Sequence, residues 1–401
     1  MRIYETLPQE VDEVLPFRNA IFNNISLQHW KAMGCTAVVA REDDDRLVGF
    51  IPLQFRRQCL NDRVSIPVVY ENAVGVAEGE RGRGIGSQMM DVAARFIADR
   101  ADAMFVIRGG EESIGYRFYR RTGHGDLSYA RSYAAPLASC RGGEVSGASI
   151  VEPEAWLALE PQLLALYARR YGRFGGGWLR EPGYWRTIQQ GHVYRDHRWQ
   201  WIVLRSESDP AVLRGYAAVV IGGSWRPSQD LRVYEVVGED DEAVRQLIAF
   251  AAAQAGPPAN AEEETQVIVP SLSLANPLAG VLEKMGFAPS PTTTQIMARI
   301  LRPERIWAAL ARGSDLLDTL ALTVATPHRS LAISDPPDAR YAVTLQTKES
   351  LLSRLFSCRL DLEAALAMEL VRWNGKDAGI RRELCRVFSF SDWVQWFTDF
   401  V

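Results

Sequence analysis

Apolar and polar positions follow their most regular pattern between residues 47 and 121. Apolar runs predict strands at Leu47–Leu53, Ala73–Ala77 and Ala103–Ile107. A helical periodicity of apolar residues runs from Ile85 to about Ala98, and a shorter helical pattern covers Ser113–Arg121. The order of two strands, a helix, a strand and a helix predicts an α/β domain.

Two further segments follow the stretch Ser139–Ser149, whose Gly, Ser and Ala residues predict a linker. In the second segment, the pattern predicts helices at 156–170 and 242–255 and strands at 199–204, 215–221, 231–237 and 265–269. In the third, it predicts helices at 306–310, 348–356 and 362–373 and strands at 317–324, 328–333 and 341–345. We therefore predict three domains of mixed α/β or α+β class, at residues 1–138, 148–299 and 300–401.

The second segment repeats the order of the first. Val236-Val237-Gly238 ends a strand before a helix, as Val74-Gly75-Val76 does, and Leu282 stands where Tyr119 stands in the first copy. The turn of the second copy, Glu239–Glu242, is acidic and would repel a phosphate. We predict that the second domain is a structural copy without this chemistry.

The turn before the first predicted helix contains most of the candidate chemistry. Gly82, Gly84 and Gly86 leave backbone N–H groups uncovered at a helix N-terminus, where the helix dipole favours anions. Arg81 and Arg83 add positive charge. These features suit a pyrophosphate, although the spacing fits neither a P-loop nor the Gly-x-Gly-x-x-Gly dinucleotide motif. The alternative is a glycine-rich turn that holds no ligand.

The motif Arg81-x-x-Gly84-x-Gly86, after a Val-x-Val strand, resembles the acyl-CoA-binding motif of the GNAT acetyltransferases. Tyr119 and Gly123 fit a second segment of that family. The resemblance covers residues 1–135 and implies an acyl-CoA N-acyltransferase fold with acetyl-CoA as the acyl donor and no metal. It implies these cofactor-binding residues: Val74, Val76, Arg81, Gly82, Arg83, Gly84, Ile85 and Gly86.

Composition and charge exclude several classes of protein. The formal net charge of −4 gives no electrostatic footprint for nucleic acid. No apolar run is long enough to span a bilayer, and the N-terminus lacks the apolar core of a signal peptide. The 5 cysteines are scattered, which suits a reducing cytoplasm, and the 5 histidines lack the spacing of metal ligands. We therefore expect a cytoplasmic protein with no metal and with neither nucleic-acid nor membrane partners.

The order of the three segments and the aromatic-rich C-terminus resemble the Eis (enhanced intracellular survival) proteins of bacteria, which are tandem GNAT enzymes. This resemblance implies a third domain like a sterol carrier protein and a homo-oligomer, a hexamer in that family. It also implies acetyl transfer to an amine, with Tyr119 as general acid and the C-terminal carboxylate, here of Val401, as general base inserted into the active site. Val401 departs from the family's usual aromatic end but keeps the carboxylate.

The amine pocket and the acceptor are less defined. Phe22, Asn24 and Trp30 are candidate pocket residues, and His124, at a normally aromatic position, could share the acid/base role. An aminoglycoside, a polyamine, a lysine side chain and an arylamine all remain open as acceptors. Two alternatives from other classes are a carrier of a lipid or hydrophobic ligand and an acyl-CoA-binding regulator without turnover.

Overall fold

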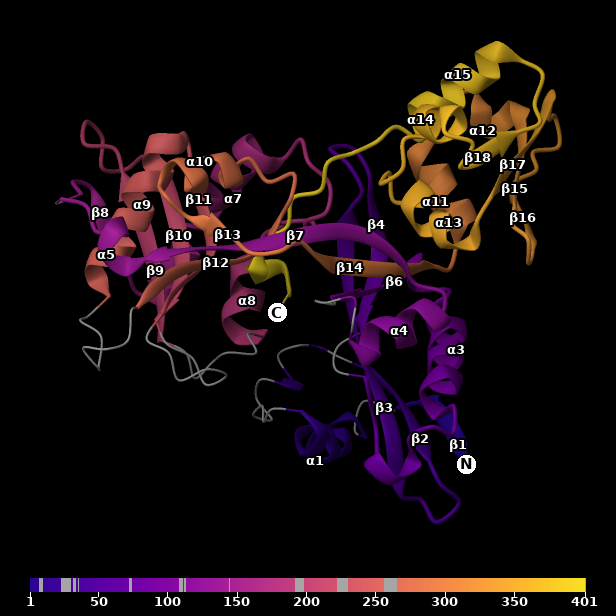
Figure 1. Ribbon diagram of the computed structural model, residues 1–401, viewed down its shortest axis with the longest axis horizontal. Helices are drawn as coiled ribbons and strands as arrows, with labels where there is room; N and C mark the ends of the chain where they lie inside the picture. The colour runs from indigo at the N-terminus through magenta and orange to yellow at the C-terminus, as the bar shows by residue number, and fades with distance from the viewer. Residues whose placement is uncertain are drawn as a thin grey trace. The chain divides into compact units, whose positions relative to one another are not determined.

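The computed structural model describes residues 1–6, 10–22, 30–31, 34, 36–71, 74–107, 111, 113–143, 145–191, 198–221, 230–255 and 265–400. The chain divides into two compact units (Figure 1). Unit 1 comprises Met1–Asn24, Gly34–Ser128 and Thr294–Asp392, and unit 2 comprises Ile25–Met33, Tyr129–Thr293 and Trp393–Val401. The segment predicted as a third domain falls mostly within unit 1, and the division into three domains stays a prediction.

Unit 1 is built on a mixed sheet. Its strands, in spatial order, are β1 (Arg2–Glu5), β2 (Thr36–Arg41), β3 (Leu47–Cys59), β4 (Ser65–Glu71), β6 (Ala103–Ile107) and β14 (Thr293–Ile300). The short β5 (Gly75–Val76) also pairs with β3. The helices of this part are α1 (Val11–Ile21), α3 (Ile85–Ile97), α4 (Ile114–Arg121) and the 3-10 turn η1 (Glu78–Glu80).

Helix α3 covers the face of this sheet, and α4 lies beside it (Figure 1). The buried residues of α3, among them Met89, Met90 and Ala93, pack on the apolar strands, as the predicted periodicity requires. The predicted bounds of α3, β6 and α4 agree with the structure to within one residue. Packing of these buried residues on the sheet therefore holds the N-terminus of α3, which follows the glycine turn, in place.

The third segment adds a second sheet to unit 1, in the order β16 (Ser330–Ser334), β15 (Leu320–Ala325), β17 (Tyr341–Thr347) and β18 (Val371–Trp373). Its helices are α11 (Pro303–Leu310), α12 (Leu316–Thr319), α13 (Glu349–Phe356), α14 (Leu362–Ala367) and α15 (Ala378–Val387). The hydroxyl of Ser353 in α13 donates to the carbonyl of Ala298 in β14 at 2.6 Å. The two sheets of unit 1 are therefore tied through α13.

Two predictions in the third segment are wrong in detail. The predicted helix 362–373 ends at Ala367, because Glu369 adopts a positive φ of 55° and the N–H of Leu370 closes back on the carbonyl of Ala365 at 2.9 Å. The following residues form β18 instead. The predicted strand 317–324 begins only at Leu320, after the short helix α12. A left-handed cap without glycine leaves little signal in the sequence.

Unit 2 has a sheet in the order β8 (Ala148–Val151), β9 (Arg198–Arg205), β10 (Leu213–Ile221), β11 (Leu231–Gly238), β12 (Gln266–Ser273) and β7 (Gly125–Pro136), with β13 (Ala288–Pro289) also on β7. Its helices are α5 (Leu137–Cys140), α6 (Pro153–Ala158), α7 (Glu160–Tyr171), α8 (Tyr184–Gly191), α9 (Asp241–Gln254), α10 (Leu278–Lys284) and the 3-10 turn η2 (Phe397–Phe400). The helix predicted at 156–170 is two helices, because Pro161 in the first turn of α7 has no N–H with which to continue α6.

The two sheets follow the same plan, which supports the repeat seen in the sequence. Each contains a parallel pair, β4–β6 in unit 1 and β11–β12 in unit 2. β7 ends the first copy of the repeat in the sequence, and β14 ends the second. β14 pairs antiparallel with β6 of the first copy, and β7 pairs antiparallel with β12 of the second, so each copy's final strand lies in the sheet of the other copy.

A buried carboxylate in unit 1 makes the stability of the fold depend on pH. Burial raises the pKa of Asp102 to about 6, and Arg305 only partly opposes this from 3.8 Å. The folded state therefore binds its proton more tightly than the unfolded chain, and stability falls as pH rises from the ordinary value to about 6. Asp102→Asn cannot titrate and should not lose stability in this way. The Tm of the variant minus the Tm of the wild type should therefore increase as pH rises to about 6.

Thermal melting of both proteins between pH about 4 and about 7 measures the difference. Asp99→Asn is the control, because the side chain of Asp99 is 92% exposed. A Tm difference for Asp102→Asn that stays constant with pH would refute the assignment.

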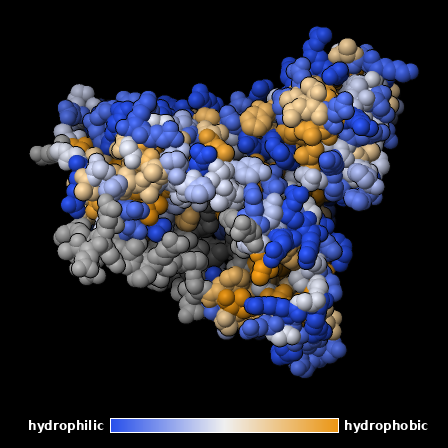
Figure 2. Space-filling model, in the orientation of Figure 1, coloured by the Kyte–Doolittle hydropathy of each residue, from blue (hydrophilic) through white to orange (hydrophobic). Residues whose placement is uncertain are grey.

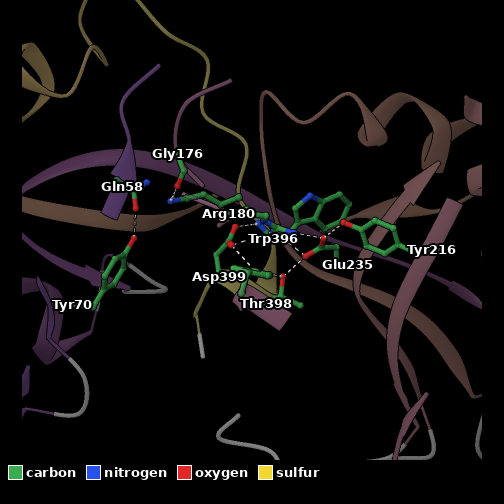
Figure 3. A network of polar contacts seen from close by, with 11 residues as sticks. Gln58, Tyr70, Gly176, Arg180, Tyr216, Glu235, Trp396, Thr398 and Asp399 are labelled. Carbon is green, nitrogen blue, oxygen red and sulfur yellow. Dashed lines mark hydrogen bonds and ion pairs between the residues drawn. The ribbon is translucent and has the colours of Figure 1, made fainter. Parts of the chain in front are cut away.

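The C-terminal segment packs into unit 2 through a buried charged network (Figure 3). Arg180 lies between two carboxylates, with Nη1 2.5 Å and Nη2 3.0 Å from the oxygens of Glu235, and Nη2 3.2 Å from Oδ1 of Asp399. Tyr184 donates to Asp399 at 2.8 Å, and Tyr216 donates to Glu235 at 2.6 Å. Trp393 and Trp396 are buried. The C-terminal segment is therefore docked into unit 2 as far as the described residues extend.

Removal of the arginine from this network should be strongly destabilising. Arg180→Met leaves Glu235 and Asp399 buried without a cation, a change that costs about 3–5 kcal/mol in comparable buried pairs. We expect a large loss of Tm in denaturation followed by tryptophan fluorescence, and faster digestion of the C-terminus by carboxypeptidase. Arg245→Met, which breaks the exposed pair with Glu242, should shift the midpoint little. Equal effects of the two variants would contradict this account of the terminus.

Candidate active site

The glycine turn of unit 1 has the backbone geometry that the sequence predicted. Gly82 and Gly84 have φ of 84° and 79°, in the left-handed region that glycine adopts without strain. Gly84 is the N-cap of α3, and no side chain caps this helix end. A Cβ on Gly82 would have no heavy atom within 4 Å, so the turn is open on its outer side. An uncapped helix N-terminus in open space is suited to an anion.

A pocket of about 1080 Å³ opens at this turn. Its lining contains the turn and the helix start, the ends of β5 and β6, and one side of α4. The predicted residues that line it are Phe22, Val74, Val76, Arg81, Gly82, Gly84, Ile85, Gly86 and Tyr119. The pocket is therefore large enough for an extended ligand and includes most of the site predicted from the sequence.

The pocket lies where the strands separate. The parallel pairing of β4 with β6 reaches Tyr70 and Phe105, and the next residues on the two strands, Glu71 and Val106, line the pocket. Ala77 donates its N–H to Val48 in β3 at 2.9 Å. Because neighbouring residues of an antiparallel strand point their polar groups to opposite sides, the N–H of Val76 points away from β3. That direction makes it available to a ligand beside β5.

Close packing of two helices brings Tyr119 to the pocket. Ser113 caps α4 by accepting a hydrogen bond from the N–H of Tyr116 at 3.1 Å. A Cβ on Gly86 would lie 3.1 Å from the ring of Phe118, so the glycine lets α4 approach the first turn of α3. Tyr119 follows Phe118 and is 6% exposed. The helix start and the tyrosine are therefore held in one wall.

Three arginines and two glutamates line the pocket: Arg81, Arg117 and Arg121, with Glu80 in the turn and Glu71 at the end of β4. The hydrogen bond from Arg46, and then that from Arg83, keeps the pKa of Glu80 below its ordinary value. The negative charge of Glu80 is therefore offset by Arg46 and Arg83.

Some predicted site residues lie elsewhere. Arg83 pairs with Glu42 at 2.8 Å and with Glu80, and it is absent from the pocket lining. Trp30 is buried and grouped with unit 2. Asn24 and Val401 lie outside the described residues.

Phe22 lines the pocket and is 37% exposed, and Ile114 of the same lining is 80% exposed. Figure 2 shows a hydrophobic area on this face of unit 1, between α1 and α4. An acceptor that enters here would meet apolar surface first.

His124 does not line the pocket but lies directly behind Tyr119. The two rings make an edge-to-face contact with centroids 5.3 Å apart. The Nε2 atom of His124 is 2.9 Å from Oε1 of Glu71, and both side chains are fully buried. The sequence reasoning missed Glu71. The available signal was an acidic residue that ends an apolar strand just before the Val-x-Val segment.

The equivalent helix of unit 2 has lost the open N-terminus. The side chain of Asp240 caps α9 by accepting from the N–H of Ala243 at 2.7 Å. A carboxylate already occupies the place that an anion would take, which agrees with the predicted loss of phosphate chemistry in the second copy. Among the residues described in both units, no group of three or more His, Cys, Asp or Glu side chains could hold a metal ion. No helix of the described chain is both long and apolar enough to cross a membrane.

Residues 3–124 match the model of the Acetyltransferase (GNAT) family. No curated protein matches the chain. The chain is similar to the solved structure of a conserved protein of unknown function from Enterococcus faecalis V583, with a TM-score of 0.71, 14% identity and 98% of each chain covered.

A GCN5-related N-acetyltransferase from Kribbella flavida has a TM-score of 0.65 and 18% identity, with 98% of this chain and 99% of that chain covered. Eis1 from Mycobacterium abscessus has a TM-score of 0.60 and 15% identity, with 98% of each chain covered. At such identities, these similarities show the fold.

The predicted fold class is therefore confirmed: the protein has a mixed α/β architecture with the GNAT acyl-CoA N-acyltransferase fold. Residues 3–124 therefore form a GNAT acetyltransferase domain, and this domain makes the protein an acyltransferase enzyme.

Proposed function

We propose that this enzyme transfers the acetyl group of acetyl-CoA to a small-molecule amine in the pocket of unit 1. The observation that carries the proposal is the uncapped N-terminus of α3, which opens into the same pocket that Tyr119 lines. Backbone N–H groups at a helix start are suited to a pyrophosphate, and a nearby phenol is suited to proton transfer.

The residues of the pocket divide by the chemistry they offer. The N–H groups of Ile85 and Gly86 and the guanidinium of Arg81 would hold the pyrophosphate, and Val74 would flank the rest of the donor. Bound acetyl-CoA would supply the acetyl thioester. The N–H of Val76 is a fixed donor for the negative charge that develops on the thioester oxygen.

Two proton transfers complete the reaction. Tyr119 gives its hydroxyl proton to the departing thiolate, and a base accepts a proton from the amine. The resemblance to the Eis proteins predicts the carboxylate of Val401 as that base, and this role stays a prediction. The likeness of the third segment to a sterol carrier protein, the homo-oligomer, the cytoplasmic location and the absence of membrane and nucleic-acid partners likewise stay predictions.

The test is release of free thiol by the full chain from acetyl-CoA against a panel of amines. The panel contains an aminoglycoside, spermidine, a lysine peptide, phenethylamine and 4-ethylaniline, and mass spectrometry identifies the acetylated product. We expect amine-dependent thiol release with at least one member. Acetyl-CoA binding without turnover would favour the regulator, and protein that carries lipid but ignores acetyl-CoA would favour the carrier.

A further inference from the structure

The wall of the pocket contains a buried carboxylate that the mechanism above does not use. Glu71 ends β4, lines the pocket, and is 2% exposed. Its Oε1 atom contacts Nε2 of His124 at 2.9 Å. Its Oε2 atom is also buried and has no hydrogen-bond partner among the residues that the structure describes.

His124 is itself held in place from two sides. Its Nδ1 atom is 3.2 Å from the hydroxyl of Thr122, and its ring packs against Tyr119. The backbone N–H of His124 donates to the carbonyl of Tyr119 at 3.0 Å. With the proton on Nε2, the imidazole donates to one oxygen of the Glu71 carboxylate and leaves the other oxygen to accept. The pair therefore joins the end of β4 to the helix that carries the predicted general acid.

A carboxylate in this position is unfavourable unless something compensates it. A buried ionised group without full pairing is strongly destabilising, so such groups are paired, protonated or in contact with a ligand. Within the described residues, Glu71 forms no ion pair with an arginine, although three arginines line the same pocket. The unpaired oxygen is therefore suited to a proton or to a cation that enters the pocket.

We propose that Glu71, in place of the Val401 carboxylate that the resemblance predicts, accepts the proton of the attacking amine, that His124 positions Glu71, and that the acceptor is a cationic primary alkylamine. This inference rests on the proposed function. The site combines a carboxylate for an ammonium group with apolar entry surface at Phe22 and Ile114. Because the side chain of Glu71 is shielded from bulk solvent, the ammonium reaches it directly on entering or through one bound water.

The nitrogen loses one proton before the attack and a second one after it. The ammonium gives one proton to Oε2 of Glu71, which later releases it to solvent, and the neutral amine attacks the thioester carbon. The C–N bond forms and the C–S bond breaks. The thiolate takes the hydroxyl proton of Tyr119, and the second proton of the new amide nitrogen restores the tyrosine. Free thiol, acetylated amine and one released proton are the products.

The test compares two isomeric acceptors. Phenethylamine is an alkylamine that is protonated at neutral pH, as lysine is, whereas 4-ethylaniline is an arylamine that is neutral there and needs no base to become a nucleophile. Glu71→Gln keeps the size of the side chain and a polar group for His124 but cannot take a proton. We expect kcat/KM to fall by roughly 10²-fold for phenethylamine and by less than about 3-fold for 4-ethylaniline.

A binding measurement provides a readout that does not depend on turnover. Calorimetry should show that Glu71→Gln binds phenethylamine about 10-fold or more weakly than the wild type, with unchanged affinity for acetyl-CoA. Asp102→Asn is the matched control, because Asp102 is a buried carboxylate of unit 1 outside the pocket lining. It should keep both affinities and both rates.

The positioning role of His124 needs its own variants. His124→Gln can still donate to Glu71 and should retain most of the activity with phenethylamine. The kcat/KM of His124→Phe for phenethylamine should fall to that of Glu71→Gln. The double variant Glu71→Gln with His124→Phe should be no slower than either single variant, because both remove one function. Additive losses would mean that His124 acts only through packing, and they would overturn its role.

Different outcomes of these assays separate the role of Glu71 from acetyl transfer itself. If the wild type acetylates 4-ethylaniline but neither turns over nor binds phenethylamine, the cationic acceptor is overturned and acetyl transfer stands. If Glu71→Gln loses the same factor on both acceptors, or none, and binds phenethylamine as the wild type does, Glu71 is not the proton acceptor. If no amine of the panel supports thiol release, the proposed function fails, and the binding comparison alone decides whether Glu71 recognises an ammonium.

Discussion

Tyr119→Phe should lower the turnover of acetyl-CoA with an amine by roughly 10²–10⁴-fold, the range expected when a general acid is removed. The substitution deletes the hydroxyl and keeps the ring, which packs edge-to-face on His124 and Phe118. Folding should therefore be preserved. The affinity for acetyl-CoA should also be little changed, because the expected pyrophosphate contacts come from the glycine turn.

Tyr116→Phe is the matched control on the same helix. The hydroxyl of Tyr116 donates to Asp126 at 3.1 Å, and its pKa is raised to about 12 by burial and then by that carboxylate. Tyr116 is absent from the pocket lining. Assays of thiol release from acetyl-CoA should show near-normal turnover in this variant. A Tyr119→Phe enzyme as active as Tyr116→Phe would remove Tyr119 from the mechanism.

Gly84→Glu should lower the affinity for acetyl-CoA by at least about 100-fold while the fold persists. Two effects combine: the φ of 79° strains any residue with a Cβ, and the new carboxylate faces the site expected for the pyrophosphate. Charged hydrogen bonds are worth about 1.5–3 kcal/mol each, so the loss of two reaches this size. Calorimetric titration with acetyl-CoA measures the change.

Two further variants separate strain from charge. Gly84→Ala carries the backbone strain alone and should bind with an intermediate affinity. Gly79→Glu adds the same charge in η1, where a Cβ meets nothing within 4 Å and the residue is absent from the pocket lining. It should bind acetyl-CoA nearly as the wild type does. Equal affinities of Gly84→Glu and Gly79→Glu would show that the turn is not the cofactor site.

The glycine turn at the pocket was predictable because its signals are local. A glycine at a left-handed N-cap, Arg81 three positions before it and an amphipathic helix after it all lie within a short stretch, and the structure has them at the pocket. Tyr119 was predictable through family resemblance, and its place in the pocket lining agrees with that.

The remainder depends on contacts between distant segments. Nothing local to β7 or β14 indicates that each pairs with the sheet of the other repeat. The network of Arg180, Glu235 and Asp399 combines a loop, a strand and the C-terminal segment. Glu71 and His124 are 53 positions apart and become a pair only when the end of β4 meets the segment after α4. Pairing at such separations has no pattern in a single sequence.

Unit 1 alone should hold a working acyl-CoA site, and calorimetric titration of the full chain with acetyl-CoA measures this. The account predicts saturable binding of one molecule per chain, competed by free CoA, because α3 has an open N-terminus and α9 is capped by its own Asp240. No binding, or two equivalent sites per chain, would contradict it.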